Sequence, residues 1–477
     1  MHSENPLPTK PFRVATTLAF AVMWPQVAHG ALPQPRAEFA ASIDADESAA
    51  DSASANAATP GKSGRAASYD VMLPSSEQTT PSFEWTDAPR EVPPALANAI
   101  AIVTKRDPAA QSAWLGARAA LSDARGAKWL RYPSLATNLD VINGTNRVAP
   151  SVTVEVPLWT GGQISSTISR AKKVEAASVA RWHETVLNLA LDTAQTYWNI
   201  VLYTRLEQLY RSNLEEHQKL VASMQRRVDQ EVSPRADLEL AKSRTAQIDQ
   251  ELASIQAQRL SAMRSLAELV RDTSYDLGNE PQFDASLMPN DWNGAANEVV
   301  EYNPGRARLI LEADAARSEI SIAKASMLPK VSAQYSYNEI TGSRYGIGLR
   351  MQANSGLSQL SAITSATARY EQSLDQVRLA ERQLRQEVAN EVQSFDAAIR
   401  RALAAREAAV SAQRVSQSYM RQFIAGRRSW LDVMNSLRES LTAQSGQTQA
   451  EVTAMSTSVR LQLRSGRWQP ISTPSKD

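Results

Sequence analysis

The feature that most constrains the fold is residues 163–233, a stretch of about seventy residues with no glycine and no proline. At a rise of about 1.5 Å per residue, a single helix over this stretch would be roughly 100 Å long. Its apolar positions are spaced by three and four, as in Leu214, Val221 and Val228, which is typical of a coiled-coil seam. Residues 357–425 have the same character. The sequence therefore predicts two matched helical rods, not several globular cores.

The apolar spacing changes from near 3.6 to two in four short segments, 134–142, 148–158, 330–338 and 345–352. In the second segment Val152, Val154 and Val156 share one face, and polar residues lie between them. Turn residues separate the members of each pair, Asn143-Gly144 in the first and Thr341-Gly342 in the second. We expect two hairpins, each apolar on one side and polar on the other.

An internal repeat organises these elements. Pro108 and Pro304 are 196 residues apart (304 − 108), and Asp237 and Asp432 are 195 apart (432 − 237). Each half contains a strand pair, a long helix and a returning helix. The predicted repeats are residues 94–297 and 298–466, with returning helices at 234–271 and 429–464.

The ends of the chain have a different composition. Residues 1–30 carry Lys10 and Arg13 before a short apolar run, the pattern of an export signal. Residues 31–93 are rich in Pro, Ser, Ala and acidic residues without apolar periodicity, which predicts a disordered linker. Residues 467–477 are expected to be a tail. The net charge of +1 gives no reason to expect nucleic acid as a partner, and the chain has no cysteine.

Four amphipathic strands cannot close a sheet alone, and an open sheet edge is costly in lipid. Three copies would supply twelve strands, which lies within the range of outer-membrane barrels. Aromatic residues on or beside the strands would then form a girdle at the lipid interface, namely Tyr132, Trp159, Tyr335, Tyr337 and Tyr345. The alternative is a soluble β-sandwich in which these aromatics are core residues.

The chain resembles the TolC family of outer-membrane channels over about residues 94–466. The resemblance rests on Pro133-Ser134-Leu135, on the passage from Val156 to Gly162, and on the turn from Gly426 to Val433. The second half departs from the pattern, because residues 351–356 lack the Pro and the aromatic of the first strand-to-helix junction.

The resemblance implies a mainly α fold with a small β part. It implies a homotrimer in which a twelve-stranded β-barrel in the outer membrane continues into an α-helical tunnel through the periplasm. The implied function is the exit duct of a tripartite efflux pump or a type I secretion system. The implied partners are a periplasmic adaptor (membrane fusion protein) and an inner-membrane transporter, with no cofactor and no metal.

Two interpretations are open for Asp432 at the second turn. Ser429 and Asp432 have the spacing of a helix capping box. The resemblance implies instead that Asp432 lines the tunnel entrance, where threefold symmetry would create a carboxylate ring that attracts cations. Asn435 stands where the family often has a second acidic ring, so we expect weaker cation block.

The resemblance also implies a latch that holds the entrance shut, made by Arg428, Phe423 and Asp237. Arg428 and Asp237 would form a charge-assisted bond, whereas Phe423 lacks the hydroxyl of a tyrosine. The expected adaptor-docking residues are those of the two turns, Ser233, Pro234, Gly426 and Arg427. Independently of the resemblance, Ser233-Pro234 has the composition of a helix start, with Ser as the cap.

Catalysis has little support in this sequence. His183-Glu184 lacks the second histidine of a zinc-protease helix, and Gly346-Ile347-Gly348 does not open a helix. Two alternatives without a pore remain open, a periplasmic coiled-coil adaptor and a scaffold protein. Neither explains the strand-type segments.

Overall fold

The computed structural model describes residues 86–142, 147–286, 288, 291–292, 294–339, 342–351 and 358–470. The expected export signal, residues 1–30, and most of the expected linker lie outside the described residues. The described part of the chain is mainly helical and has one small sheet, which confirms the predicted fold class.

The two halves contain the same elements in the same order. The first half comprises α1 (Pro94–Arg106), α2 (Pro108–Trp129), β1 (Ser134–Ile142), β2 (Arg147–Trp159), α3 (Gln163–Asp229) and α4 (Arg235–Val270). The second half comprises α5 (Ala295–Tyr302), α6 (Pro304–Ala325), β3 (Lys330–Asn338), β4 (Gly342–Arg350), α7 (Ser358–Ile424) and α8 (Trp430–Ser465). Three helix pairs match in length: α2 and α6 have 22 residues each, α3 and α7 have 67, and α4 and α8 have 36.

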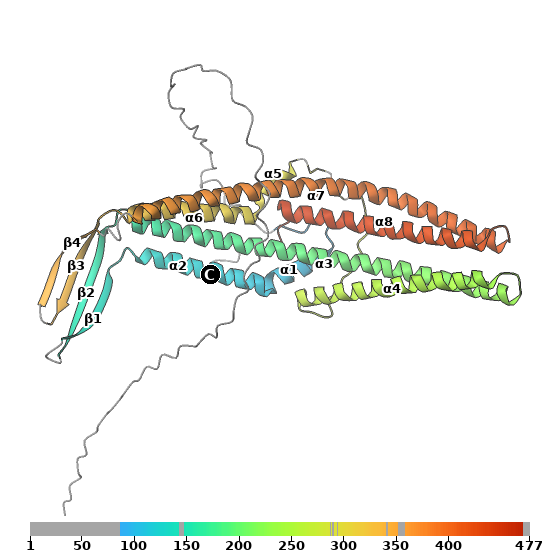
Figure 1. Cartoon of the computed structure of the whole chain (residues 1–477), viewed down its shortest axis with the longest axis horizontal. Coiled ribbons are helices and arrows are strands. Elements are labelled where there is room, and N and C mark those ends of the chain that lie inside the picture. Colours follow the sequence, from blue (N-terminus) through green and yellow to red (C-terminus); the bar gives the residue numbers. More distant parts are fainter. Residues whose placement is uncertain are drawn as a thin grey trace, which may run out of the picture. The chain divides into compact units, whose positions relative to one another are not determined.

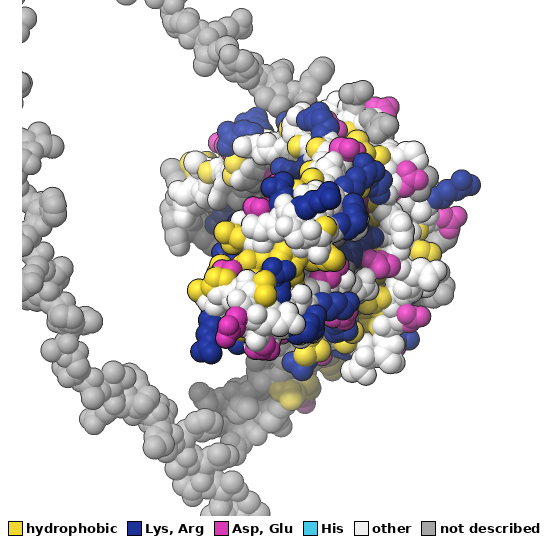
Figure 2. Space-filling view, turned by 90° about the vertical axis from the view of Figure 1, so that its right-hand side faces the viewer, with side chains coloured by type: hydrophobic (Ala, Val, Ile, Leu, Met, Phe, Trp, Pro, Cys, Tyr) yellow, Lys and Arg dark blue, Asp and Glu magenta, His cyan; other side chains and the backbone are white. Residues whose placement is uncertain are grey.

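The strands lie at one end of the long helices, and the turns that join α3 to α4 and α7 to α8 lie at the other (Figure 1). We call these two turns the first and second hairpin tips. Helix α6 packs against both α3 and α7 in the strand-proximal part, and α8 packs against both in the tip-proximal part. Figure 2 turns the tip end toward the viewer.

Each short helix that precedes a strand pair starts at an Asx-Pro dipeptide. Asp107 accepts a hydrogen bond from the backbone N–H of Ala109 at 2.7 Å, and Asn303 accepts one from Arg306 at 2.9 Å. Pro108 and Pro304 occupy the first helical turn, where a missing N–H costs nothing. These caps fix the starts of α2 and α6 at equivalent places in the repeat.

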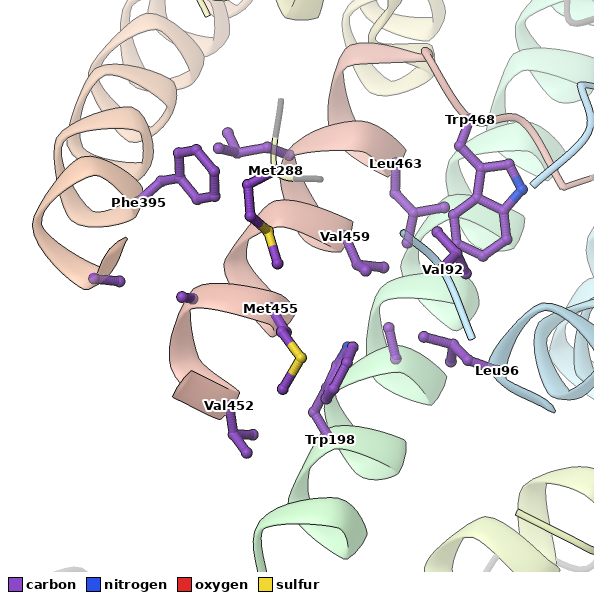
Figure 3. Close-up of a cluster of buried hydrophobic side chains, with 14 of the residues drawn as sticks. Val92, Leu96, Trp198, Met288, Phe395, Val452, Met455, Val459, Leu463 and Trp468 are labelled. Atoms are coloured by element: carbon purple, nitrogen blue, oxygen red, sulfur yellow. The ribbon is translucent and has the colours of Figure 1, made fainter. Parts of the chain in front are cut away.

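The largest hydrophobic cluster joins both halves near the middle of the long helices (Figure 3). Trp198 of α3, Phe395 of α7 and Met455 of α8 contribute to it. Val92 and Trp468 also belong to this cluster and are 4% and 2% exposed. Burial of a tryptophan and a valine removes apolar surface from water, so both chain segments are held in place.

The expected linker and tail therefore need correction at their ends. Val92 falls in the predicted 31–93 linker and Trp468 in the predicted 467–477 tail, yet both are core residues. Gln469 accepts a hydrogen bond at its carbonyl from the N–H of Thr86, and its own N–H donates to the Thr86 hydroxyl at 2.6 Å. This reciprocal pair ties the segment before α1 to the segment after α8.

Candidate functional site: the hairpin tips and the strand sheet

The two hairpin tips have the same backbone structure. In the first tip the N–H of Val232 donates to Arg227 at 2.8 Å, and in the second the N–H of Arg427 donates to Gln422 at 2.9 Å. The residue before each donor has a left-handed backbone, Glu231 with φ +60° and Gly426 with φ +71°. Both tips are thus Schellman-type helix ends. For this reason α3 stops at Asp229, earlier than the predicted Ser233.

At the second tip Ser429 caps α8, as the spacing predicts. Its hydroxyl accepts a hydrogen bond from the N–H of Asp432 at 3.2 Å. The Asp432 carboxylate lies in the first turn of α8, and its side chain is 43% exposed. Capping by Ser429 therefore involves the Asp432 backbone and leaves its carboxylate accessible.

Arg428 contacts its own tip instead of the first one. Its guanidinium lies 3.7 Å from the Asp432 carboxylate and 4.1 Å from the ring centroid of Tyr419. Within the described residues no ion pair joins Arg428 to Asp237, so the expected bond does not form inside one chain. The nearby carboxylate and aromatic face on its own hairpin hold the guanidinium instead. Tyr419 lies about one helical turn before Phe423 and was not among the predicted tip residues.

At the first tip Ser233 is not the helix cap that the sequence predicts. Pro234 occupies the cap position of α4, and no side chain caps this helix. The Ser233 hydroxyl instead accepts a hydrogen bond from the side chain of Arg227 at 3.3 Å. Asp237 lies in the first turn of α4 and is partly exposed, a favourable place for a negative charge. Pro234, Gly426 and Arg427 are exposed, as docking residues must be.

A compact apolar cluster joins the two hairpins just behind the tips. Phe423 of α7 is buried in it, together with Met224 of α3, Leu238 of α4 and Trp430 of α8. The guanidinium of Arg227 lies 5.2 Å from the Phe423 ring centroid. Phe423 thus links the hairpins by packing and needs no hydroxyl to do so. Trp430 belongs to the turn motif from Gly426 to Val433, but its packing role was not predicted, although its place directly after the cap Ser429 was a usable signal.

Asn435 lies one turn beyond Asp432 and lines a groove of about 260 Å³ between α3, α4 and α8. His217 and Tyr210 of α3 also line it. Burial lowers the pKa of His217 and raises the pKa of Tyr210. Both groups are therefore neutral at pH 7. Arg244 and Arg438 supply positive charge at the same groove.

Arginine is abundant at the tip end, where Figure 2 shows many dark-blue side chains. The exposed or partly exposed arginines of the two tips are Arg226, Arg227, Arg235, Arg421, Arg427 and Arg428. Acidic residues are interspersed with them, among them Asp229, Glu231 and Asp432. The tips thus present both signs of charge, with arginines at either side of each turn.

The four strands form one antiparallel sheet in the order β1-β2-β3-β4. Its register places apolar residues opposite one another, because Leu135 pairs with Val154, Val154 with Tyr335, and Tyr335 with Tyr345. Since side chains alternate across a strand, these residues share one face of the sheet. β1 and β4 are the two edge strands of this sheet.

The apolar face of the sheet is open within one chain. Leu139 is 74% exposed and Tyr345 is 89% exposed. The other proposed girdle residues, Tyr132, Trp159, Tyr335 and Tyr337, are also exposed. The alternative of a β-sandwich with a buried aromatic core is therefore wrong, because a single sheet has no second sheet to cover these rings. The exposed ring of Trp129 lies 5.1 Å from the ring of Tyr132, centroid to centroid, in a tilted arrangement, and Trp129 was not among the predicted girdle residues.

No helix among the described residues is both long and apolar enough to cross a membrane. No group of three or more His, Cys, Asp or Glu residues among them is arranged to hold a metal ion.

Comparison with known proteins supports the resemblance found in the sequence. Residues 100–270 match the family described as outer membrane efflux protein, and no curated protein matches the chain closely enough to count as a relative. The family match covers α2, the first strand pair, α3 and α4. It supports a channel and not an enzyme, and it supports an outer-membrane location with the helical part in the periplasm.

Several solved structures share the fold. The outer-membrane channel OprN aligns with a TM-score of 0.71 at 17% identity, covering 79% of this chain and 91% of OprN. VceC from Vibrio cholerae, an outer membrane protein, aligns at 0.68 and 19% identity, covering 78% of this chain and 96% of VceC. The open-state MtrE channel from Neisseria gonorrhoeae aligns at 0.67 and 17% identity, covering 81% of this chain and 95% of MtrE. The TolC-type fold is thereby confirmed.

Proposed function

We propose that three copies of this chain form an outer-membrane channel-tunnel that acts as a passive exit duct. The barrel would contain twelve strands, four from each chain, and the long helices would enclose a periplasmic tunnel. The duct itself uses no nucleotide and forms no covalent intermediate. Energy comes from an inner-membrane transporter, reached through a periplasmic adaptor.

The open sheet is the observation that carries this proposal. β1 and β4 each leave one edge without a partner, and one face of the sheet exposes apolar and aromatic side chains. In lipid, each unpaired backbone group costs several kcal/mol, so the edges must pair. Pairing β4 of one copy with β1 of the next removes every edge and places the apolar face against lipid.

At the other end, threefold symmetry would bring three copies of Asp432 together at the tunnel entrance. Its carboxylate is accessible, which a cation-attracting ring requires. Asn435 is also exposed but carries no charge, so a second ring would be neutral. We expect cation preference from Asp432 alone.

Because Arg428 and Asp237 do not pair within one chain, we place the latch between copies. Arg428 has its own carboxylate partner only at 3.7 Å, and Asp237 is partly exposed on the other hairpin. In a closed trimer, Arg428 of one copy can reach Asp237 of a neighbour. Arg428→Ser should then raise single-channel conductance, whereas equal conductance in both proteins would exclude a latch role for Arg428.

The adaptor would dock on the exposed turns, formed by Ser233 and Pro234 in the first tip and by Gly426 and Arg427 in the second. Efflux of small molecules and type I secretion of a protein both use such a duct. The structural relatives OprN and MtrE are outer-membrane channels, which agrees with either route.

The direct test is single-channel recording in a planar bilayer with detergent-extracted protein from the outer-membrane fraction. A trimer with steady, cation-preferring steps is the expected result, and Asp432→Ala should reduce the cation preference. A water-soluble species that never conducts would favour the periplasmic adaptor or scaffold over the channel.

A further inference from the structure

The polar face of β3 and β4 carries an unusual set of cations. Lys330 and Arg350 are direct partners in the register, and Arg344 is the partner of Ser336. Alternation places all three cations on the face opposite the apolar one. The same face contains Gln334, because a Cβ added to Gly348 would lie 3.7 Å from its side chain. In the proposed barrel this face lines the lumen.

The Lys330–Arg350 pair is costly without a ligand. Like charges placed directly opposite each other in antiparallel strands destabilise the pairing. None of the ion pairs found among the described residues includes Lys330, Arg344 or Arg350. The repulsion is therefore not relieved by a carboxylate of the same chain.

The residues beside these cations on the same face are small. Gly346 and Gly348 separate Arg344 from Arg350 on the face of β4, and Ser332 lies beside Gly348 on β3. A Cβ at Gly346 would meet nothing within 4 Å. Flexible cationic side chains thus border an open strip that a solute can enter.

The only carboxylate on this face, within the part of the sheet whose side chains are described, is Glu155. Glu155 pairs with Gln334, which lies on the same face of β3 as Lys330 and four residues farther along the strand. Among the residues of this face whose side chains are described, three cations thus stand against one carboxylate, and the register places Asp140 of β1 on the same face near the hairpin end. Threefold symmetry would repeat this excess at the same level of the lumen.

Protection of an edge strand explains part of this pattern, since charged residues on an edge discourage wrong pairing. Arg344 and Arg350 lie on the edge strand β4 and fit that explanation. Lys330 does not, because β3 is an interior strand paired on both sides. A cation placed directly opposite Arg350 on an interior strand needs another reason.

We propose that Lys330 and Arg350 form a binding site for multivalent anions at the helix-proximal end of the barrel lumen, with Arg344 adding positive charge six residues farther along β4 toward the hairpin turn. Its ligands are solutes with several phosphate or carboxylate groups, which arginine and lysine bind through charge-assisted hydrogen bonds. The site rests on the proposed function, since it requires the closed barrel. The duct then has opposite fixed charges at its two ends, carboxylates at the entrance and cations beyond the tunnel.

The test uses single channels of the full-length protein with inositol hexakisphosphate as the probe. Protein added from one side keeps its helices there, so the barrel opens toward the other chamber. We expect block from the barrel side at lower probe concentration than from the tip side. The triple variant Lys330→Gln, Arg344→Gln, Arg350→Gln should need about tenfold more probe for half-block.

Two variants make the test specific. Glu155→Gln removes the carboxylate of the same face and should strengthen the block. Arg350→Lys keeps the charge and should retain most of the block, whereas Arg350→Gln should weaken it, and both single changes disturb folding less than the triple variant.

If the channels conduct but the probe does not block them from the barrel side, the anion site is wrong and the proposed channel function stands. Equal block of the triple variant and the parent would also overturn it. Absence of any conductance would instead overturn the proposed function, so the two failures are distinguishable.

Discussion

Helices α4 and α8 occupy the same place in the two repeats and have the same length, yet they differ in burial. Six of the 36 residues of α4 are buried, against twenty of the 36 residues of α8. Helix α8 packs on both α7 and α3, whereas α4 packs mainly on α3. Equal elements from a repeated sequence thus acquire different roles through their neighbours.

The difference appears at equivalent residues, 195 positions apart. Glu451 of α8 is buried and contacts Arg205 and Arg406 of α3 and α7, both at 3.4 Å. Its counterpart on α4, Gln256, donates one hydrogen bond to Glu207 at 3.2 Å. In the proposed trimer, we expect the less buried face of α4 to contact the next copy.

The largest expected effect is at the ends of these helices. Gly466 and Arg271 are equivalent and both have left-handed backbones, with φ +74° and +58°. A Cβ on Gly466 would lie 2.5 Å from the ring of Tyr302. Gly466→Ala should therefore cost about 3 kcal/mol of stability through clash and strain, measured by thermal unfolding in detergent.

Two controls accompany this change. Arg271→Gly should stabilise by roughly 0.5–1 kcal/mol, because glycine adopts this backbone freely. Gly446→Ala in α8, where a Cβ meets nothing within 4 Å, should not destabilise. An unchanged unfolding midpoint for Gly466→Ala would contradict the packing against Tyr302.

The second expected effect concerns the ionic contacts of α8. Glu451→Ala removes one carboxylate partner of the largely buried Arg205 side chain. This change should lower the free energy of unfolding by about 2–3 kcal/mol. The matched change Gln256→Ala should cost under about 1 kcal/mol, since it removes one neutral donor. Equal costs at the two positions, compared by unfolding midpoints, would show that burial does not separate α4 from α8.

A third effect distinguishes α3 from α7 through pH. Burial lowers the pKa of His183 from 6.5 to about 4. Between these values the unfolded chain binds more protons, so stability is complete above about pH 6.5 and falls as pH drops toward 4. The expected loss attributable to His183 at pH 5 is about 1–2 kcal/mol.

His183→Gln should remove this part of the pH dependence between pH 5 and 7. The matched control is Arg378→Gln at the equivalent position of α7, where the side chain is 54% exposed and pairs with Asp375. Parallel pH profiles for the parent and His183→Gln would contradict a neutral buried imidazole. His217, whose pKa is also lowered by burial, supplies a second contribution that remains in the variant.

The smallest expected effect is at the tips. Glu231 holds a left-handed backbone that Gly426 adopts without strain. Glu231→Gly should stabilise the first tip and Gly426→Ala should destabilise the second, each by roughly 1 kcal/mol or less. Hydrogen exchange of the tip amides measures both changes, and shifts of the same sign would contradict the shared turn geometry.

Much of this fold was predictable because its periodicity is strict. The long runs without Gly or Pro, with apolar spacings of three and four, favour helices, and a spacing of two favours strands, so the rods and the strand pairs follow from local pattern. The Ser429 cap was equally local. At the equivalent position of the first tip, 195 residues earlier, the cap residue is Pro234, which has no side-chain acceptor. Ser233 therefore does not cap α4, and its hydroxyl binds Arg227 instead.

Contacts between distant segments were not predictable in this way. Nothing in the composition near Val92 and Trp468 indicated that they meet in one core, because their burial depends on where α1 and α8 end in space. The partner of Arg428 was not predictable for the same reason, because its guanidinium lies over the ring of Tyr419 on the preceding helix. Periodicity identifies faces, but it does not identify which neighbour covers them.

The central claim, that β4 of one copy pairs with β1 of the next, is open to direct measurement because the chain has no cysteine. Cysteine at Ala136 on β1 would be combined in turn with cysteine at Gly348, Leu349 or Arg350 at the helix-proximal end of β4, and the protein oxidised in the outer membrane. Our account predicts a covalent trimer for at least one pair. The control pair Ala136 and Thr153, which are partners within one chain, should give only monomer. Monomer alone for every β1–β4 pair would contradict closure of the sheet by three copies.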